Sequence, residues 1–204
     1  MENLPKQTEG GYSDNEHHII CNSLTEAKQL YYAASRNLLA INQWGNLCNN
    51  LLKAQFALFN ESGIPIYRLP RENDFIRIDL PGPGPINGEG YDWVQIEKIA
   101  TFSKPVNDEV GILIRVRPVS NPLNEKMDTA HFFSSEATST FIIKRIGTMV
   151  IAEIHGRNEK PNIEIDNAVD TVRNKVVAKL AIAKLSDIQW KDLCKALLTN
   201  ETRR

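Results

Sequence analysis

Two histidines and one carboxylate carry the residue types from which acid–base chemistry can be built. Glu153 precedes His155 by two positions, so in a strand both side chains lie on the same face. A carboxylate in that position can tune an imidazole as a general base. His131, directly before Phe132 and Phe133, is the second candidate. A hydrolase or an isomerase could use this set, although a histidine at a strand end more commonly serves as a hydrogen-bonded surface residue.

Arginines occupy polar positions of the expected strands, and they have two interpretations. Arg77 alternates with aliphatic residues in one segment, and Arg115 and Arg117 do so in another. If the polar face meets water, these side chains form cross-strand ion pairs worth about 0.2 to 1 kcal/mol each. If the sheet is curved and the face lines a cup, Arg115 and Arg117 offer paired donors to an anionic ligand. We favour the first interpretation.

A loop rich in glycine and proline leads to further candidates. Residues 81–93 end in Tyr91, Asp92 and Trp93, and a surface loop that ends in aromatic residues can form the rim of a pocket. The loop does not suit a nucleotide phosphate, because its three prolines remove backbone donors and no Gly-Lys-Ser/Thr follows. We expect a stiff connection, with Asp92 and Trp93 as candidates for a pocket rim.

Other kinds of site have no support in the sequence. His131 and His155 lack the ligand spacing of structural zinc sites, and no cysteine lies near either. No Gly-x-Ser-x-Gly elbow indicates a nucleophilic serine. We therefore expect neither a metal nor a cofactor. The candidate binding residues are Arg77, Asp92, Trp93, Arg115, Arg117, His131, Glu153 and His155.

The helices that position these residues are indicated by caps and apolar spacing. Ser23 to Glu26 form a capping box, and an apolar stripe follows with the spacing of one helix face: Ala27, Leu30, Tyr31, Ala34, Leu38 and Ile41. A second helix is predicted between Asp166 and Ala183, and a third begins at Ser186 with Trp190 on its buried face. Residues 1–16 are polar and contain two glycines, which predicts a flexible tail.

Between the helices, from Gln55 to about Gly156, the hydrophobic pattern alternates as it does in half-buried strands. Two hairpins are predicted: Gln55–Phe59 with Ile64–Arg68, and Phe141–Ile146 with Met149–His155. We count about seven strands, joined by connections mostly too short for parallel crossovers.

The fold class that follows is α+β. We predict a strongly bent antiparallel sheet or small β-barrel of about seven strands, with an N-terminal helix and two C-terminal helices. A helix-grip arrangement, in which a curved sheet wraps a long C-terminal helix, and a split barrel are the alternatives. We expect residues 17–204 to form a single domain.

The composition narrows the possible binding partners and the cellular compartment of the protein. Lys and Arg number 24 against 25 for Asp and Glu, a net charge of -1, so nothing in the balance attracts nucleic acid or an anionic membrane. The N-terminus lacks the apolar core of a signal peptide, and three scattered cysteines fit reduced thiols. We expect a cytoplasmic protein without nucleic-acid or membrane partners.

Three functions are compatible with these patterns. We favour a non-enzymatic binding module, which holds either a small ligand in the concavity of the sheet or a protein partner. The first alternative is a hydrolase or an isomerase that uses His155 or His131 with Glu153 and the strand arginines. The second is a structural subunit of a larger assembly. The sequence indicates neither the ligand nor the oligomeric state.

Overall fold

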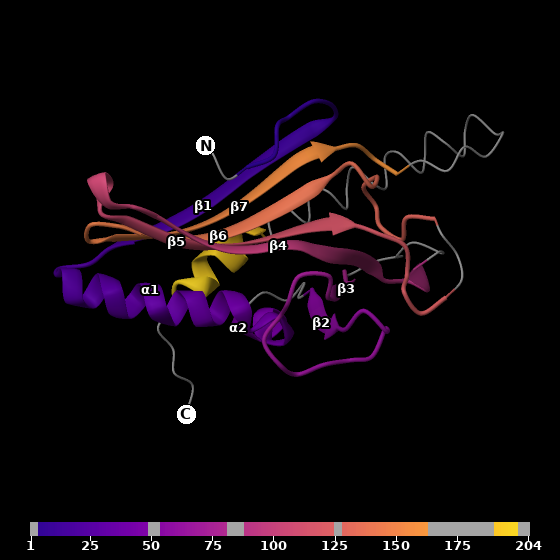
Figure 1. The fold of residues 1–204 in the computed structure, drawn as a ribbon, viewed down its shortest axis with the longest axis horizontal. Coiled ribbons are helices and arrows are strands. Elements are labelled where there is room, and N and C mark those ends of the chain that lie inside the picture. Colours follow the sequence, from indigo (N-terminus) through magenta and orange to yellow (C-terminus); the bar gives the residue numbers. More distant parts are fainter. Residues whose placement is uncertain (1–3, 49–53, 81–87, 125–127, 163–189, 200–204) are drawn as a thin grey trace.

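The computed structural model describes residues 4–48, 54–80, 88–124, 128–162 and 190–199. These form a seven-stranded antiparallel sheet with helices on one of its faces (Figure 1). The α+β class and the number of strands are therefore as predicted. In chain order the elements are β1 (Gly11–Ile20), α1 (Leu24–Leu39), a 3-10 turn (Ile41–Gln43), α2 (Trp44–Leu47), β2 (Gln55–Phe59), β3 (Phe75–Asp79), β4 (Asp92–Lys104), a 3-10 turn (Pro105–Asn107), β5 (Glu109–Pro118), β6 (Thr138–Ile146) and β7 (Met149–Glu159).

The two faces of the sheet differ because apolar residues alternate along each strand. We call the face that packs against the helices the inner face and the opposite one the outer face. The inner face carries aliphatic and aromatic residues of every central strand, among them Ile76, Val94, Ile114, Phe141 and Ile154. It joins α1 and the C-terminal helix in the main hydrophobic core. The alternation of Ile76 and Ile78 with Phe75, Arg77 and Asp79 is as predicted.

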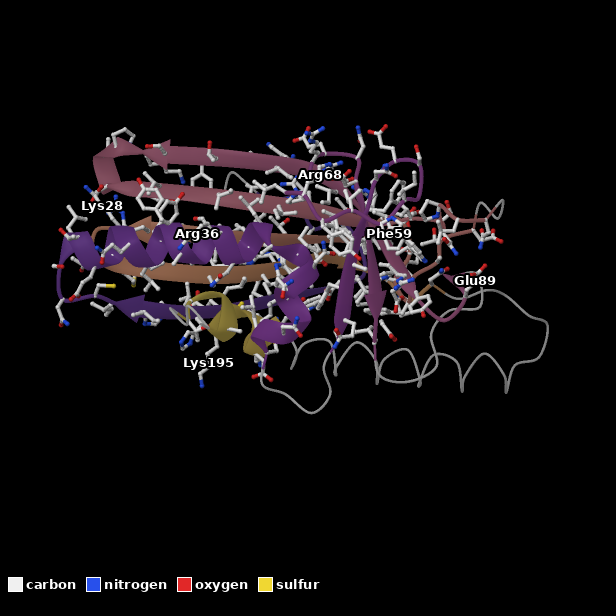
Figure 2. All side chains as sticks on the ribbon, turned by 90° about the horizontal axis from the view of Figure 1, so that it is seen from below. Lys28, Arg36, Phe59, Arg68, Glu89 and Lys195 are labelled. Carbon is white, nitrogen blue, oxygen red and sulfur yellow. The ribbon has the colours of Figure 1, made fainter. Side chains whose placement is uncertain are left out.

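The helices pack across the inner face side by side, as Figures 1 and 2 show. Ala27, Leu30, Ala34 and Leu38 of α1 are buried, which is the stripe expected from the sequence. The predicted capping box is present: the Ser23 hydroxyl accepts a hydrogen bond from the Glu26 amide at 3.2 Å, while the Glu26 carboxylate accepts one from the Asn22 amide at 2.9 Å. The first bond satisfies a donor that the first turn of a helix leaves open, and the second holds the residue before the cap.

The C-terminal helix is described over residues 190–197. Leu193, Cys194 and Leu197 lie in the main core, so the buried face of the last predicted helix is confirmed. Ser186, where we expected its cap, and the whole of the predicted helix between Asp166 and Ala183 lie outside the described residues. None of the helices in the described part of the chain has both the length and the hydropathy needed to cross a bilayer.

The sheet is open, so the prediction of a closed small barrel is wrong. The strand order is β1-β7-β6-β5-β4-β3-β2, with β1 at one edge and β2 at the other. In the chain, these two edge strands are separated by α1 and α2. The helices fill the concavity instead of letting the edges pair. This is the helix-grip arrangement given above as the main alternative.

The first strand corrects the prediction of a flexible tail over residues 1–16. Gly11 to Ile20 pair with β7 from Glu159 to Met149. Residues before this strand are also held, because the Asn158 side chain accepts hydrogen bonds from the Thr8 amide at 2.8 Å and the Glu9 amide at 3.2 Å. An edge strand has one neighbour and much exposed surface. Its residues are therefore polar, and apolar alternation does not reveal it.

One predicted strand is replaced by a looser connection. Ile64–Arg68 was expected to pair with Gln55–Phe59, but in the described structure a single bridge, between Phe59 and Pro65, joins these segments. The turn between them forms, since the Asn60 amide donates to the Ile64 carbonyl at 2.9 Å. Beyond the bridge the Asn42 side chain takes the place of ladder bonds, since it accepts from the Leu58 amide and donates to the Ile66 carbonyl, both at 2.8 Å. Strand β3 pairs with the other edge of β2. The other predicted hairpin, β6 with β7, is confirmed, with Gly147 at φ +55° in its turn.

Candidate functional site

A pocket lies between the inner face of the sheet and the C-terminal helix. Its floor is aliphatic and comes from Ile76 and Ile78 of β3, Val94 of β4 and Val116 of β5. These positions face inward because they alternate with the outward residues of the same strands. The pocket therefore lies where the sheet, α2 and the C-terminal helix meet.

Four aromatic side chains make one wall of the pocket. Trp44 lies against Phe56 and Phe141, with ring centroids 5.3 and 4.8 Å apart. Trp190 of the C-terminal helix lies 5.5 Å from Phe141 in an edge-to-face arrangement. The Trp44 indole N–H donates to the Asn37 and Leu38 carbonyls at 3.2 and 3.1 Å, which fixes the ring at the end of α1. Such aromatic groups gain about 0.5 to 1.5 kcal/mol per pair beyond their burial.

The opposite wall is the segment 131–133, which holds His131, Phe132 and Phe133. It belongs to no regular strand, so side chains from elsewhere position it. The Asp92 carboxylate, at the start of β4, accepts a hydrogen bond from the Phe132 amide at 2.9 Å. The Asn162 side-chain amide donates to the His131 carbonyl at 3.1 Å and the Thr129 carbonyl at 2.9 Å. These contacts tie the wall to the start of β4 and to a residue just after β7, which lie at the same end of the sheet.

His131 and Ser139 are the polar side chains among the described lining residues. His131 is buried, and its Nδ1 accepts a hydrogen bond from the Phe133 amide at 2.9 Å. A ring nitrogen that accepts carries no proton, so the ring proton of the neutral histidine is on Nε2. The ring also stacks on Phe132, with centroids 4.4 Å apart. The hydrogen bond and the stacking therefore fix both the orientation and the tautomer of the His131 ring.

The free space in the pocket is small in this structure. It amounts to about 20 Å³ for the centres of water-sized molecules, which is room for about one water. Small-molecule sites commonly enclose about 300 to 1,000 Å³. A ligand larger than water would therefore have to move some of the lining side chains.

Asp92 and His131 are the two candidates from the sequence that the structure brings to this pocket. Asp92 supports the pocket wall through its hydrogen bond with the Phe132 amide, and His131 lines the pocket directly. The other six lie on the outer face, because they alternate with inward residues of their strands: Arg77, Trp93, Arg115, Arg117, Glu153 and His155. The inner and outer candidates are therefore separated by the sheet itself.

On the outer face, His155 lies between two carboxylates. Its Nδ1 is 2.5 Å from Asp14 Oδ1, and its Nε2 is 3.4 Å from Glu153 Oε2. Burial of the ring lowers the pKa of His155, but the hydrogen bonds to Glu153 and Asp14 outweigh burial, and the pKa is raised above its ordinary value. A histidine that keeps its proton is a poor general base near neutral pH. The geometry thus does not favour the catalytic use of His155 with Glu153.

The arginines of the outer face take part in local contacts. Arg117 pairs with Glu97 and donates to the Ser135 carbonyl at 2.7 Å. The Arg115 Nε donates to the Thr140 hydroxyl at 3.4 Å. Arg77 lies over the rings of Tyr91 and Phe59, at 4.3 and 5.3 Å from their centroids.

Trp93 is fully buried in a small apolar cluster on the same face, together with Phe59 and Ala130. Its ring lies 5.1 Å from that of Phe59, and its backbone amide donates to the Ala130 carbonyl at 2.8 Å. Trp93 thus packs on the side of the sheet away from the pocket.

No three His, Cys, Asp or Glu side chains within the described ranges gather in a way that could hold a metal ion. Cys21, Cys48 and Cys194, which all lie in those ranges, form no disulfide. Burial raises the pKa of Cys194 to about 12.

No family model matches the chain, and no curated protein matches its sequence significantly. Solved structures are similar to it in fold. A hypothetical protein of Helicobacter pylori is 11% identical, with 93% of this chain and 87% of that one covered and a TM-score of 0.44. A protein of Thermus thermophilus is 11% identical over 92% and 94%, with a TM-score of 0.43. Norcoclaurine synthase of Thalictrum flavum is 10% identical over 97% of both chains, with a TM-score of 0.41.

Identities and scores this low carry nothing about the ligand or the chemistry of this chain. The strand order and the position of the helices are the observations that assign the fold. They give a helix-grip arrangement, an open antiparallel sheet with helices packed in its concavity.

The sequence did not single out the aromatic wall or Asn162 as parts of a site. Phe56 and Phe141 fall on inward positions of their strands, so alternation alone assigns them to the core. What makes them pocket residues is the approach of Trp44 and Trp190, which are 146 positions apart (190 − 44). Asn162 acts through backbone carbonyls, and no residue pattern signals that.

Proposed function

We propose that this protein binds a small, mainly apolar ligand that carries an aromatic ring and one hydrogen-bonding group. The site is the pocket between the inner face and the C-terminal helix. The observation that carries the proposal is the lining, in which aromatic residues face each other across an aliphatic floor and the polar side chains are His131 and Ser139.

The chemistry of the lining supports an apolar ligand. Burial of apolar surface contributes about 25 cal/mol per Å², and aromatic rings add stacking or edge-to-face contacts. No Lys, Arg, Asp or Glu side chain is among the lining residues that the structure describes. A ligand with a full charge at the centre of this pocket would lose its hydration without gaining an ionic partner from them.

His131 and Ser139 support one polar group on the ligand. Both belong to the pocket end that is formed by segment 131–133 and the start of β6. A serine hydroxyl can donate and accept. A ligand hydroxyl or carbonyl near this end would therefore be oriented by hydrogen bonding, while the rest of the molecule contacts the aromatic wall.

The small free volume implies that binding rearranges the lining. Phe133 and Trp190 are only partly buried, whereas Trp44 is buried and fixed by two hydrogen bonds. We therefore expect Phe133 and Trp190 to move and Trp44 to stay. A tryptophan that shifts in the pocket provides a fluorescence signal for binding.

The proposal is tested by titrating the protein with 2-naphthol, an uncharged aromatic probe with one hydroxyl group. We expect saturable binding of one probe per chain. Ser139→Leu, which fills the polar end of the pocket, should weaken binding at least tenfold. Ser103→Leu, a matched change at an exposed position of β4, should leave it unchanged.

Thermal unfolding of both variants shows whether they are folded before the titration. If Ser139→Leu does not fold, Ser139→Val replaces it as a smaller change. Probe binding that does not saturate would contradict the proposal. So would equal affinity in the folded Ser139 variant and the wild-type protein.

A further inference from the structure

The outer face carries a chain of charged side chains that joins the edge strand β1 to the rest of the sheet. Asp14 of β1 contacts His155 and Arg157 of β7, with Asp14 Oδ1 at 2.5 Å from His155 Nδ1 and 2.7 Å from an Arg157 nitrogen. Glu153 of β7 contacts Lys144 of β6 at 2.5 Å. His155 lies between the two carboxylates and connects the contact of Asp14 with that of Glu153 and Lys144. This network is on the opposite side of the sheet from the pocket.

We propose that His155 is a proton-dependent clamp that holds the edge strand β1 on the sheet. Protonated His155 donates to Asp14 and to Glu153 at once. When the ring loses one proton, only one of the two carboxylates can keep its hydrogen bond, and β1 is held less firmly. The proposal concerns the stability of β1 and does not depend on ligand binding.

The geometry requires the protonated ring. Carboxylates that are ionised only accept hydrogen bonds, so both ring nitrogens facing them must carry a proton. The His155 and Glu153 side chains are 12% and 11% exposed, so water replaces their mutual contact poorly, whereas Asp14 is 43% exposed. The hydrogen bonds outweigh burial and also lower the pKa of both carboxyl groups, for which burial alone would raise it.

Charged groups from each neighbouring strand face the clamp. On β1 these are Asp14 and, opposite Glu153, Glu16. On β6 and β7 they are Lys144 and Arg157, and on β5 Arg115 lies beside Thr140, the cross-strand neighbour of His155. The carboxylates favour the protonated ring and the cations oppose it. The hydrogen bonds to Glu153 and Asp14 decide the balance.

Strand β1 is the element that such a clamp affects, because it is an edge. Among the described strands its ladder partner is β7, so side-chain links to β7 add to a backbone ladder on one side alone. Asn15, next to Asp14, offers its carbonyl to the Cys194 thiol at 3.6 Å. A weaker attachment of β1 would therefore also weaken the packing of the C-terminal helix and make Cys194 more accessible to solvent.

The direction of the pH effect follows from the raised pKa of His155. The contribution of the clamp is complete below the ordinary histidine pKa of 6.5 and is lost as pH rises through the higher value of the folded state. At the acid end, the pKa values of Asp14 and Glu153 are lowered, so their contributions are complete above the ordinary values of 3.8 and 4.5 and are lost as pH falls below them. The clamp is thus closed at mildly acid pH and opens as pH rises.

Hydrogen exchange of the amides in β1, measured against pH and normalised to the β6 amides, tests the clamp. In the wild-type protein we expect the relative protection of β1 to fall by about three- to tenfold as pH rises through the His155 transition, the value of one net hydrogen bond. His155→Gln should abolish this step. His18→Gln changes an exposed residue of β1 and should keep the pH-dependent step.

A second readout at fixed pH 7 uses the thiol. Cys194 should react with a thiol reagent faster in His155→Gln than in the wild-type protein or in His18→Gln. Relative protection of β1 that is independent of pH in the wild-type protein would overturn the clamp. Equal Cys194 reactivity in all three proteins would overturn its link to the C-terminal helix.

Discussion

At the residue scale, the two histidines that the sequence put forward together have different environments. His131 is in the pocket with Nδ1 as an acceptor, whereas His155 is on the outer face between two carboxylates. The sequence places His155 near a strand end and His131 outside the expected strands, but it cannot tell which face of the sheet is enclosed. That depends on where the helices pack. The sequence identified the two histidines as candidates. The packing of α1 and the C-terminal helix decides that one lies in the pocket and the other on the outer face.

The hydrogen bond from the Phe133 amide predicts the tautomer of His131. We expect the Nε2–H form in long-range proton–nitrogen NMR spectra at neutral pH, because a protonated Nδ1 could not accept from that amide. His155 in the same spectra should keep both ring protons to a higher pH than a free histidine does. An Nδ1–H tautomer of His131 would contradict the description of the pocket wall.

At the scale of elements, segment 131–133 is held by side chains instead of a strand ladder. Asp92→Ala removes the acceptor of the Phe132 amide, which lies in a buried setting. We expect a loss of about 1 to 3 kcal/mol in the free energy of unfolding, the cost of an unsatisfied buried donor. Urea unfolding measures it.

Asp92→Asn is the matched control for this change, since its carbonyl oxygen can still accept from the Phe132 amide. Its loss of stability should be clearly smaller than that of Asp92→Ala. Equal losses in the two variants would mean that this hydrogen bond does not hold the segment.

The elements also show where sequence patterns are informative. The Ser23 cap and the stripe from Ala27 to Leu38 identified α1, because local hydrogen bonds and one-sided burial leave a signal in consecutive residues. Strand β1 left no such signal, since its partner β7 lies about 140 positions away along the chain (155 − 14 = 141). Its polar, exposed residues fit an edge and also fit a tail.

At the scale of the whole molecule, antiparallel pairing and an α+β class followed from short connections and alternation. Closure did not follow, because the same strands can form a barrel or an open sheet. The choice depends on whether the concavity holds helices. Here α1, α2 and the C-terminal helix occupy it, and the space that remains beside them is the pocket.

The measurement that tests the central claim most directly is an NMR titration of the labelled protein with 2-naphthol. Our account predicts that chemical-shift changes concentrate at Phe132, Phe133, Ser139, Phe141 and the Trp190 indole. The outer-face residues Arg77, Arg117 and His155 should stay unchanged. Changes that concentrate on the outer face, or none at saturating probe, would contradict a ligand site between the sheet and the C-terminal helix.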